Sequence, residues 1–185
     1  MVPLSELWLP ILLSAVFVFV VSSILHMVLP YHRSDYRKLP AEDSAMAALR
    51  TPTLAPGLYM FPHCSHQQMN SPEAKARFTQ GPVGTLTILP TGVPVMPKYL
   101  AKWFGYCLLI GLFSAYVAGR TLAPGTDYLQ VFRVVGATSF MAFGLGPLAN
   151  AIWKGMPLAV VAKEVIDGLI YCGVAGGTFG WLWPR

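Results

Sequence analysis

Four long apolar stretches divide this sequence and leave few folds open to it. A helix needs about 20 residues to cross the hydrocarbon core of a bilayer. The stretches are residues 7–29, 99–118, 134–153 and the uncharged 168–183, which belongs to a helix that we expect to begin at Pro157. All five tryptophans lie at the ends of these stretches, at the depth that tryptophan prefers in membranes. We therefore predict an all-α integral membrane protein with four transmembrane helices.

The scarcity of charge agrees with this prediction. Only 11% of the residues are charged, against about 25% in soluble domains, while 55% are hydrophobic. This balance excludes a disordered chain and argues against a soluble enzyme. The net charge of +5 comes from cations scattered at the helix ends, where anionic headgroups attract them. We therefore expect the lipid bilayer as a partner and no nucleic acid.

The first apolar stretch could instead be a cleaved signal peptide. No Lys or Arg precedes Arg33, the stretch exceeds the 7–15 residues of a signal core, and no small-residue cleavage site follows it. We expect it to remain as the first membrane helix.

The distribution of Lys and Arg predicts the orientation. Seven cations lie near span ends in the loop between the first two spans and in the short loop before the fourth, and three lie on the other side. Cytoplasmic loops carry the excess of cations. We expect a multi-pass protein of the bacterial inner (cytoplasmic) membrane with both termini outside the cytoplasm.

The chain thus divides into a first span (1–30), a cytoplasmic proline-rich loop (31–98) and three further spans (99–185). The loop holds nine of the sixteen prolines, which break long helices. We predict short helices at 40–50 and at 72–78, the second capped by Ser71, and a strand at 85–89. The loop is too apolar for a free linker, so we expect it to pack on the membrane surface or on another subunit.

Two histidines and a cysteine form the one metal-like motif of the loop. His63, Cys64 and His66 could bind zinc or copper. A structural zinc site needs four ligands, and no second pair follows. The alternative is a polar loop whose His and Cys side chains meet solvent or a partner.

His26 lies late in the first stretch. A histidine inside a membrane helix is a candidate ligand for a cofactor such as a haem or a chlorophyll. Its position four residues before Pro30 favours instead an interfacial side chain that meets water.

Lys163 and Asp167 precede the uncharged part of the fourth span. Their i,i+4 spacing predicts an ion pair near the headgroups. In the alternative, Asp167 is a proton or cation site opposite the break that runs from Gly144 to Pro147 in the third span, because glycine-proline interruptions mark binding sites in transporters.

Small residues recur at four-residue spacing in two spans. Such spacing lets helices approach closely in lipid. The faces are formed by Gly111, Ala115 and Gly119 in the second span, and by Gly173, Gly176, Gly177 and Gly180 in the fourth. We expect them to pack against each other or against a partner.

Catalytic motifs for hydrolases, metalloproteases and nucleotide-binding enzymes are absent, so we predict that the protein is not an enzyme and needs no cofactor. We expect it to act by association with other membrane subunits or with itself, as an accessory or stabilising subunit of a larger assembly, such as a respiratory or photosynthetic complex. The alternatives are a small transporter or channel that uses Asp167, and a metal-binding protein.

Several stretches resemble an uncharacterised family of small four-span bacterial inner-membrane proteins. They are residues 32–40, 81–84, 119–125, 152–155, 167–171 and 177–184. The resemblance implies a bacterial inner-membrane setting, and it brings no activity and no site residues.

Overall fold

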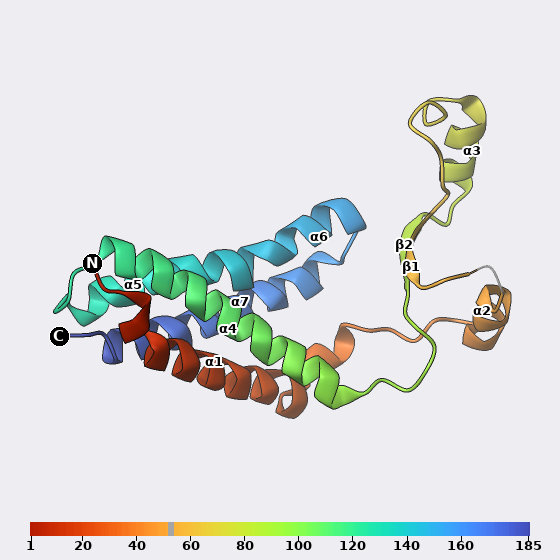
Figure 1. Ribbon diagram of the computed structural model, residues 1–185. Helices are drawn as coiled ribbons and strands as arrows, with labels where there is room; N and C mark the ends of the chain where they lie inside the picture. The colour runs from red at the N-terminus through yellow and green to blue at the C-terminus, as the bar shows by residue number, and fades with distance from the viewer. Residues whose placement is uncertain (52–53) are drawn as a thin grey trace. The chain divides into compact units, whose positions relative to one another are not determined.

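The computed structural model describes residues 1–51 and 54–185, and it is mostly helical (Figure 1). Two of the long helices contain a π-helical turn, at Ile24–Val28 and at Met141–Leu145. The long helices are α1 (Trp8–Ser23), α4 (Met96–Thr121), α5 (Tyr128–Phe140) with its continuation α6 (Gly146–Lys154), and α7 (Leu158–Trp181).

Three helical stretches of the described chain are long and apolar enough to cross a membrane. They are Trp8–Val28, Met96–Thr121 and Tyr128–Lys154. Their mean hydropathies are 2.5, 1.5 and 1.4, the largest belonging to the stretch that contains α1. The prediction of a helical chain with membrane-spanning segments is confirmed to this extent. Helix α7 forms over the predicted region but is not among the three, because Lys163, Glu164 and Asp167 lie in its first half.

The long helices pack together, with α4 against α1 and α7 against both α5 and α1 (Figure 1). Close approach depends on small residues. A Cβ atom on Gly111 would lie 3.3 Å from the carbonyl oxygen of Ile11, and one on Gly176 would lie 2.9 Å from that of Phe132. The core between the helices is made of apolar side chains without solvent exposure, such as Leu7, Val131 and Phe179.

The predicted small-residue faces therefore lie inside the chain, but they do not face each other. Ala115 is fully buried, and a Cβ on Gly119 would lie 2.5 Å from the carbonyl oxygen of Val2. The α7 face meets α5, where Tyr128 lies against Gly177 and Gly180. Gly173 takes no part in this packing, because a Cβ there would have no neighbour within 4 Å.

Both termini lie at the same end of the helix bundle (Figure 1). The amide of Val2 donates to the carbonyl of Gly119 at the end of α4, and the amide of Gly125 donates to the carbonyl of Pro184. At the opposite end, the chain leaves α1 through its π turn and a 3-10 turn, Pro30–Ser34. This turn, which was expected to belong to the loop, is part of the same compact unit as the helices (1–35, 95–152 and 156–185).

The second unit comprises residues 36–94 with 153–155. It contains α2 (Glu42–Leu49), β1 (Gly57–Phe61), α3 (Pro72–Gln80) and β2 (Gly84–Ile88). The strands pair antiparallel, with Tyr59 opposite Leu86. Both predicted short helices form, although α2 begins two residues later than expected, after Ala41 with its positive φ of 51°. The cap of α3 is confirmed, because the amide of Ala74 donates to Ser71 Oγ at 3.1 Å.

Candidate functional site

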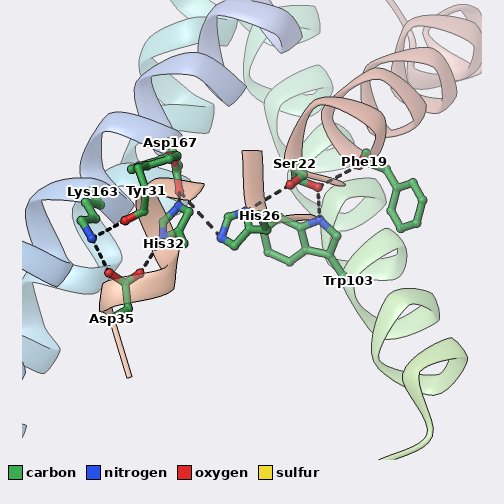
Figure 2. A network of polar contacts seen from close by, with 9 residues as sticks. All are labelled: Phe19, Ser22, His26, Tyr31, His32, Asp35, Trp103, Lys163 and Asp167. Atoms are coloured by element: carbon green, nitrogen blue, oxygen red, sulfur yellow. Dashed lines mark hydrogen bonds and ion pairs between the residues drawn. The ribbon is translucent and has the colours of Figure 1, made fainter. Parts of the chain in front are cut away.

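The candidate site lies where the turn after α1 meets the first half of α7 (Figure 2). Pro30 begins the 3-10 turn, and its fixed φ favours the sharp change of direction. The turn brings Tyr31, His32 and Asp35 against α7. On α7 itself, Lys163 and Asp167 are four residues apart and therefore share one face of the helix.

Asp167 is the central acid of this site. The residue is 2% exposed, although it carries a carboxylate. Its Oδ1 accepts a hydrogen bond from the hydroxyl of Tyr31. Its Oδ2 lies 2.8 Å from Nε2 of His32 and 3.8 Å from Nε2 of His26. A buried carboxylate is costly unless it is paired and hydrogen-bonded, and these neighbours supply both conditions.

The predicted ion pair between Lys163 and Asp167 is wrong. Nζ of Lys163 lies 2.6 Å from Oδ1 of Asp35 and also donates to the carbonyl of Tyr31 at 2.5 Å and to Ser34 Oγ at 2.9 Å. The turn after α1 offers three oxygen atoms to one ammonium group, which local spacing on α7 could not reveal. The Lys163 hydrogen bond, assisted by one from His32, holds the pKa of Asp35 below its ordinary value.

The two imidazole rings are held by their Nδ1 atoms. Nδ1 of His32 lies 2.6 Å from Oδ2 of Asp35, and Nδ1 of His26 lies 3.1 Å from the carbonyl oxygen of Ser22. The rings stack with centroids 4.2 Å apart. Because Nδ1 is engaged in both rings, both Nε2 atoms are left to face Asp167 (Figure 2). His32 bridges two carboxylates, donating from both nitrogens when it is protonated.

A cavity of about 760 Å³ opens beside this network, within the helix bundle. Its volume is in the range of small-molecule sites. Its lining combines aromatic side chains with a few polar and acidic ones, among them Trp103, Tyr106, Phe143, Glu164, Asp167 and Tyr171. His26 also lines the cavity, and its side chain is half-exposed.

Tyr171 lines the cavity and carries a buried hydroxyl group. The residue is 4% exposed, and its hydroxyl has no hydrogen-bond partner among the residues that the structure describes. Its ring is held by Phe143 and Trp103, with centroids 5.4 and 6.0 Å away. Buried polar groups are nearly always hydrogen-bonded, so this hydroxyl is an exception among the described residues.

The interruption of the third long helix lies next to Asp167. The α-helix gives way to a π-helical turn at Met141–Leu145, and helix α6 begins at Gly146. A Cβ on Gly168 would lie 2.4 Å from Cα of Gly144, so the two backbones touch there. Gly146 and Pro147 line the cavity together with Asp167. The structure thus places the interruption of the third long helix and the side chain of Asp167 at the same cavity.

The other predicted site residues lie apart from this cluster. His63 and His66 are exposed and Cys64 is half-buried, in the second unit. Within residues 1–51 and 54–185, the one group of three potential metal-ligand side chains within 4.8 Å of one another is His26, His32 and Asp167. The sequence pattern pointed to His26 and Asp167 but not to His32, because residue 32 follows the first apolar stretch and was expected to belong to the loop. Pro30, between the two histidines, was the signal that the chain turns back.

Comparison with protein-family models, with curated proteins and with solved structures finds no match to this chain.

Proposed function

We propose that this protein is a small membrane transporter or channel that binds a proton or another cation at Asp167. One observation carries the proposal. Asp167 is buried, and it lines the cavity beside the interrupted helix. Ionisable residues inside membrane bundles are costly and mark ion and proton pathways.

The lining of the cavity favours a positively charged solute. Two acids, Glu164 and Asp167, face the cavity. The aromatic rings of Trp103, Tyr106 and Phe143 also line it, and aromatic faces attract cations.

The broken helix supports movement of the solute as well as binding. Interrupted helices in transporters free backbone groups at the depth of the binding site. Here the π-helical turn, the backbone contact between Gly144 and Gly168, and the cavity all lie at one level of the bundle.

The proposal includes α7 as a fourth membrane span. Its 24 residues extend for about 36 Å at 1.5 Å per residue, enough to cross the hydrocarbon core. Lys163 and Asp167 are both paired inside the bundle, which lowers their cost near lipid. With four spans both termini would lie on one side, and the excess of cations at the other end supports our proposal that this end faces the cytoplasm of a bacterial inner membrane.

Flux into proteoliposomes tests the proposal. The full chain is reconstituted into liposomes that contain a proton-sensitive or a Zn²⁺-sensitive dye. Wild-type protein should give flux above that of empty liposomes for at least one ion, and Asp167→Asn should reduce it at least tenfold. Asp127→Asn is the matched control, because the same change is made at an exposed site at the other end of the bundle. Equal flux in wild type and Asp167→Asn, or no flux with either dye, contradicts the proposal.

Association with another membrane subunit is the second candidate function. The observation in its favour is the two-stranded sheet of the second unit, whose Leu58, Met60 and Phe61 are 60%, 49% and 40% exposed. A lone two-stranded sheet is marginally stable in water, and a partner protein would cover these side chains. The small-residue faces do not support a partner, because all of their residues except Gly173 pack within the chain.

Native mass measurement after purification in mild detergent tests this second function. A stoichiometric membrane subunit that is retained by wild type and lost on Leu58→Ser with Met60→Ser supports it. A clean monomer contradicts it.

A further inference from the structure

We propose that His26, His32 and Asp167 form a binding site for a divalent transition-metal ion of the Zn²⁺ class. This inference deepens the proposed function, because it names the cation that the Asp167 site takes. Two imidazoles with one carboxylate are a ligand set that such ions favour. None of these residues belongs to the His63, Cys64 and His66 motif of the second unit.

The two distances from Oδ2 of Asp167 suit a single ion. Zn–N and Zn–O bonds are about 2.0–2.2 Å, so two ligand atoms of one tetrahedral ion lie about 3.3 Å apart. Oδ2 of Asp167 is 2.8 Å from Nε2 of His32 and 3.8 Å from Nε2 of His26, and these two distances bracket that value. The ion would replace the proton that joins His32 to Asp167. The half-exposed ring of His26 has the freedom to turn out of the stack and point its Nε2 at the ion.

Each ligand also has a hydrogen-bond partner of the kind found around metal sites. In metal sites, a ligating histidine usually donates its other ring N–H to a carboxylate or a backbone carbonyl, which fixes the tautomer. His32 has Asp35 in this role, and His26 has the carbonyl of Ser22. The hydroxyl of Tyr31 engages Oδ1 of Asp167 and leaves Oδ2 for the ion. All three ligands therefore have the outer-shell partner that a metal site requires.

The site is open on one side. Three protein ligands leave a fourth coordination position of a tetrahedral ion vacant, as in sites that exchange water or substrate. His26 and Asp167 line the cavity, so this position is reached from there. An exchangeable ion fits transport, whereas a structural zinc would be enclosed by four protein ligands. Mg²⁺ and Ca²⁺ prefer oxygen ligands alone, and the two imidazoles select against them.

Cobalt absorption tests the site directly. The full chain, purified in detergent and treated with chelator, is titrated with Co²⁺, whose visible bands report coordination by protein. Wild type should bind one equivalent, Zn²⁺ should displace it, and Mg²⁺ at the same concentration should not. His26→Ala and His32→Ala should weaken binding at least tenfold. The matched control is His66→Ala, an exposed histidine of the second unit, which should leave binding unchanged.

A variant that exchanges one metal-binding side chain for another shows whether weaker binding comes from loss of the ligand or from loss of folding. His26→Cys replaces an imidazole by a thiolate at the half-exposed position. In this variant, bound Co²⁺ should acquire a thiolate-to-cobalt charge-transfer band in the near ultraviolet, which wild type lacks. The band places residue 26 in the coordination sphere, and its absence from a folded variant that still binds Co²⁺ overturns the assignment of His26.

The outcomes separate this inference from the proposed function. If wild type binds no Co²⁺, or if His66→Ala weakens binding as much as His26→Ala, the metal site is refuted. Asp167-dependent proton flux in that case still supports the proposed function. If Co²⁺ binds as expected while Asp167→Asn leaves every flux unchanged, the metal site stands and the transport function is refuted.

Discussion

The helix bundle and the segment 36–94 are built on opposite principles. The bundle buries apolar side chains from every long helix and joins residues 31–35 to residues 163–167 by hydrogen bonds and ion pairs. Among the described residues of 36–94, only Pro62 and Ala74 are buried. The bundle is therefore held by contacts between distant parts of the sequence, whereas the segment has mainly local contacts besides the pairing of β1 with β2.

The local contacts of the segment are short-range hydrogen bonds. The hydroxyl of Tyr59 donates to the carbonyl of Ala55 at 2.7 Å, and Ser71 caps α3. Regions with few buried apolar contacts open at low free energy. We therefore expect substitutions in the bundle to change global stability and those in the segment to act locally.

The largest expected effect is at the closest helix contact. Gly168→Ala places a Cβ 2.4 Å from the backbone of Gly144. Because the neighbouring atoms belong to the backbone, a helix must shift to make room. We expect a loss of about 3 kcal/mol, at the upper end for overpacking, measured by thermal unfolding in detergent. Gly173→Ala is the control on the same helix, because a Cβ there has no neighbour within 4 Å. Equal losses in the two variants would refute the close contact.

The second-largest change in stability is expected from loss of the ion pair between Lys163 and Asp35, at the turn after α1. Asp35→Asn removes the partner of Lys163 and His32, and we expect a loss of about 2 kcal/mol near neutral pH. The pKa of Asp35 is depressed in the folded protein. Its contribution is therefore fully present above the unfolded pKa of about 3.9 and is lost as the pH falls through the folded pKa.

Unfolding midpoints of wild type and Asp35→Asn, measured with chelator present, should accordingly converge as the pH is lowered below about 4. Asp43→Asn, the same change at an exposed site in the segment, should stay within about 0.5 kcal/mol of wild type. A gap between wild type and Asp35→Asn that widens on acidification would contradict the assignment.

A smaller effect tests the local character of the segment. Ser71→Ala removes the cap of α3 and should cost about 1 kcal/mol. Amide hydrogen exchange should rise in α3 alone, while the unfolding midpoint of the bundle stays unchanged. Ser71→Asp restores an acceptor and should restore protection. A fall in the bundle midpoint would show that the two regions are coupled.

The smallest change in stability is expected at Tyr171, which lines the cavity. Tyr171→Phe removes a buried hydroxyl without a partner in the described structure and should be neutral or stabilising by up to about 1 kcal/mol. Tyr31→Phe removes a hydroxyl that donates to Asp167, so it should destabilise. Equal destabilisation by both variants would mean that Tyr171 has a partner after all.

Local patterns made much of the fold predictable. The apolar stretches, the proline at the start of the 3-10 turn, the short helices and Ser71 all act over a few residues. Strand β1 was missed, because it pairs with β2 across more than 20 residues, and its own sequence shows no clear alternation of apolar and polar positions. The pairing of Lys163 was predicted wrongly for the same reason, since its true partner is 128 positions away.

The sequence by itself determined that the chain is helical and that it carries segments suited to a membrane, and it offered Asp167 as one candidate site. These properties follow from hydropathy and residue type, which need no knowledge of neighbours. Only the tertiary structure decided that Asp167 meets His32 rather than Lys163, and that Asp167 lies beside the helix break and the cavity. Those contacts depend on how the turn after α1 folds against α7, and the geometry of a turn against a distant helix is set by packing rather than by local pattern.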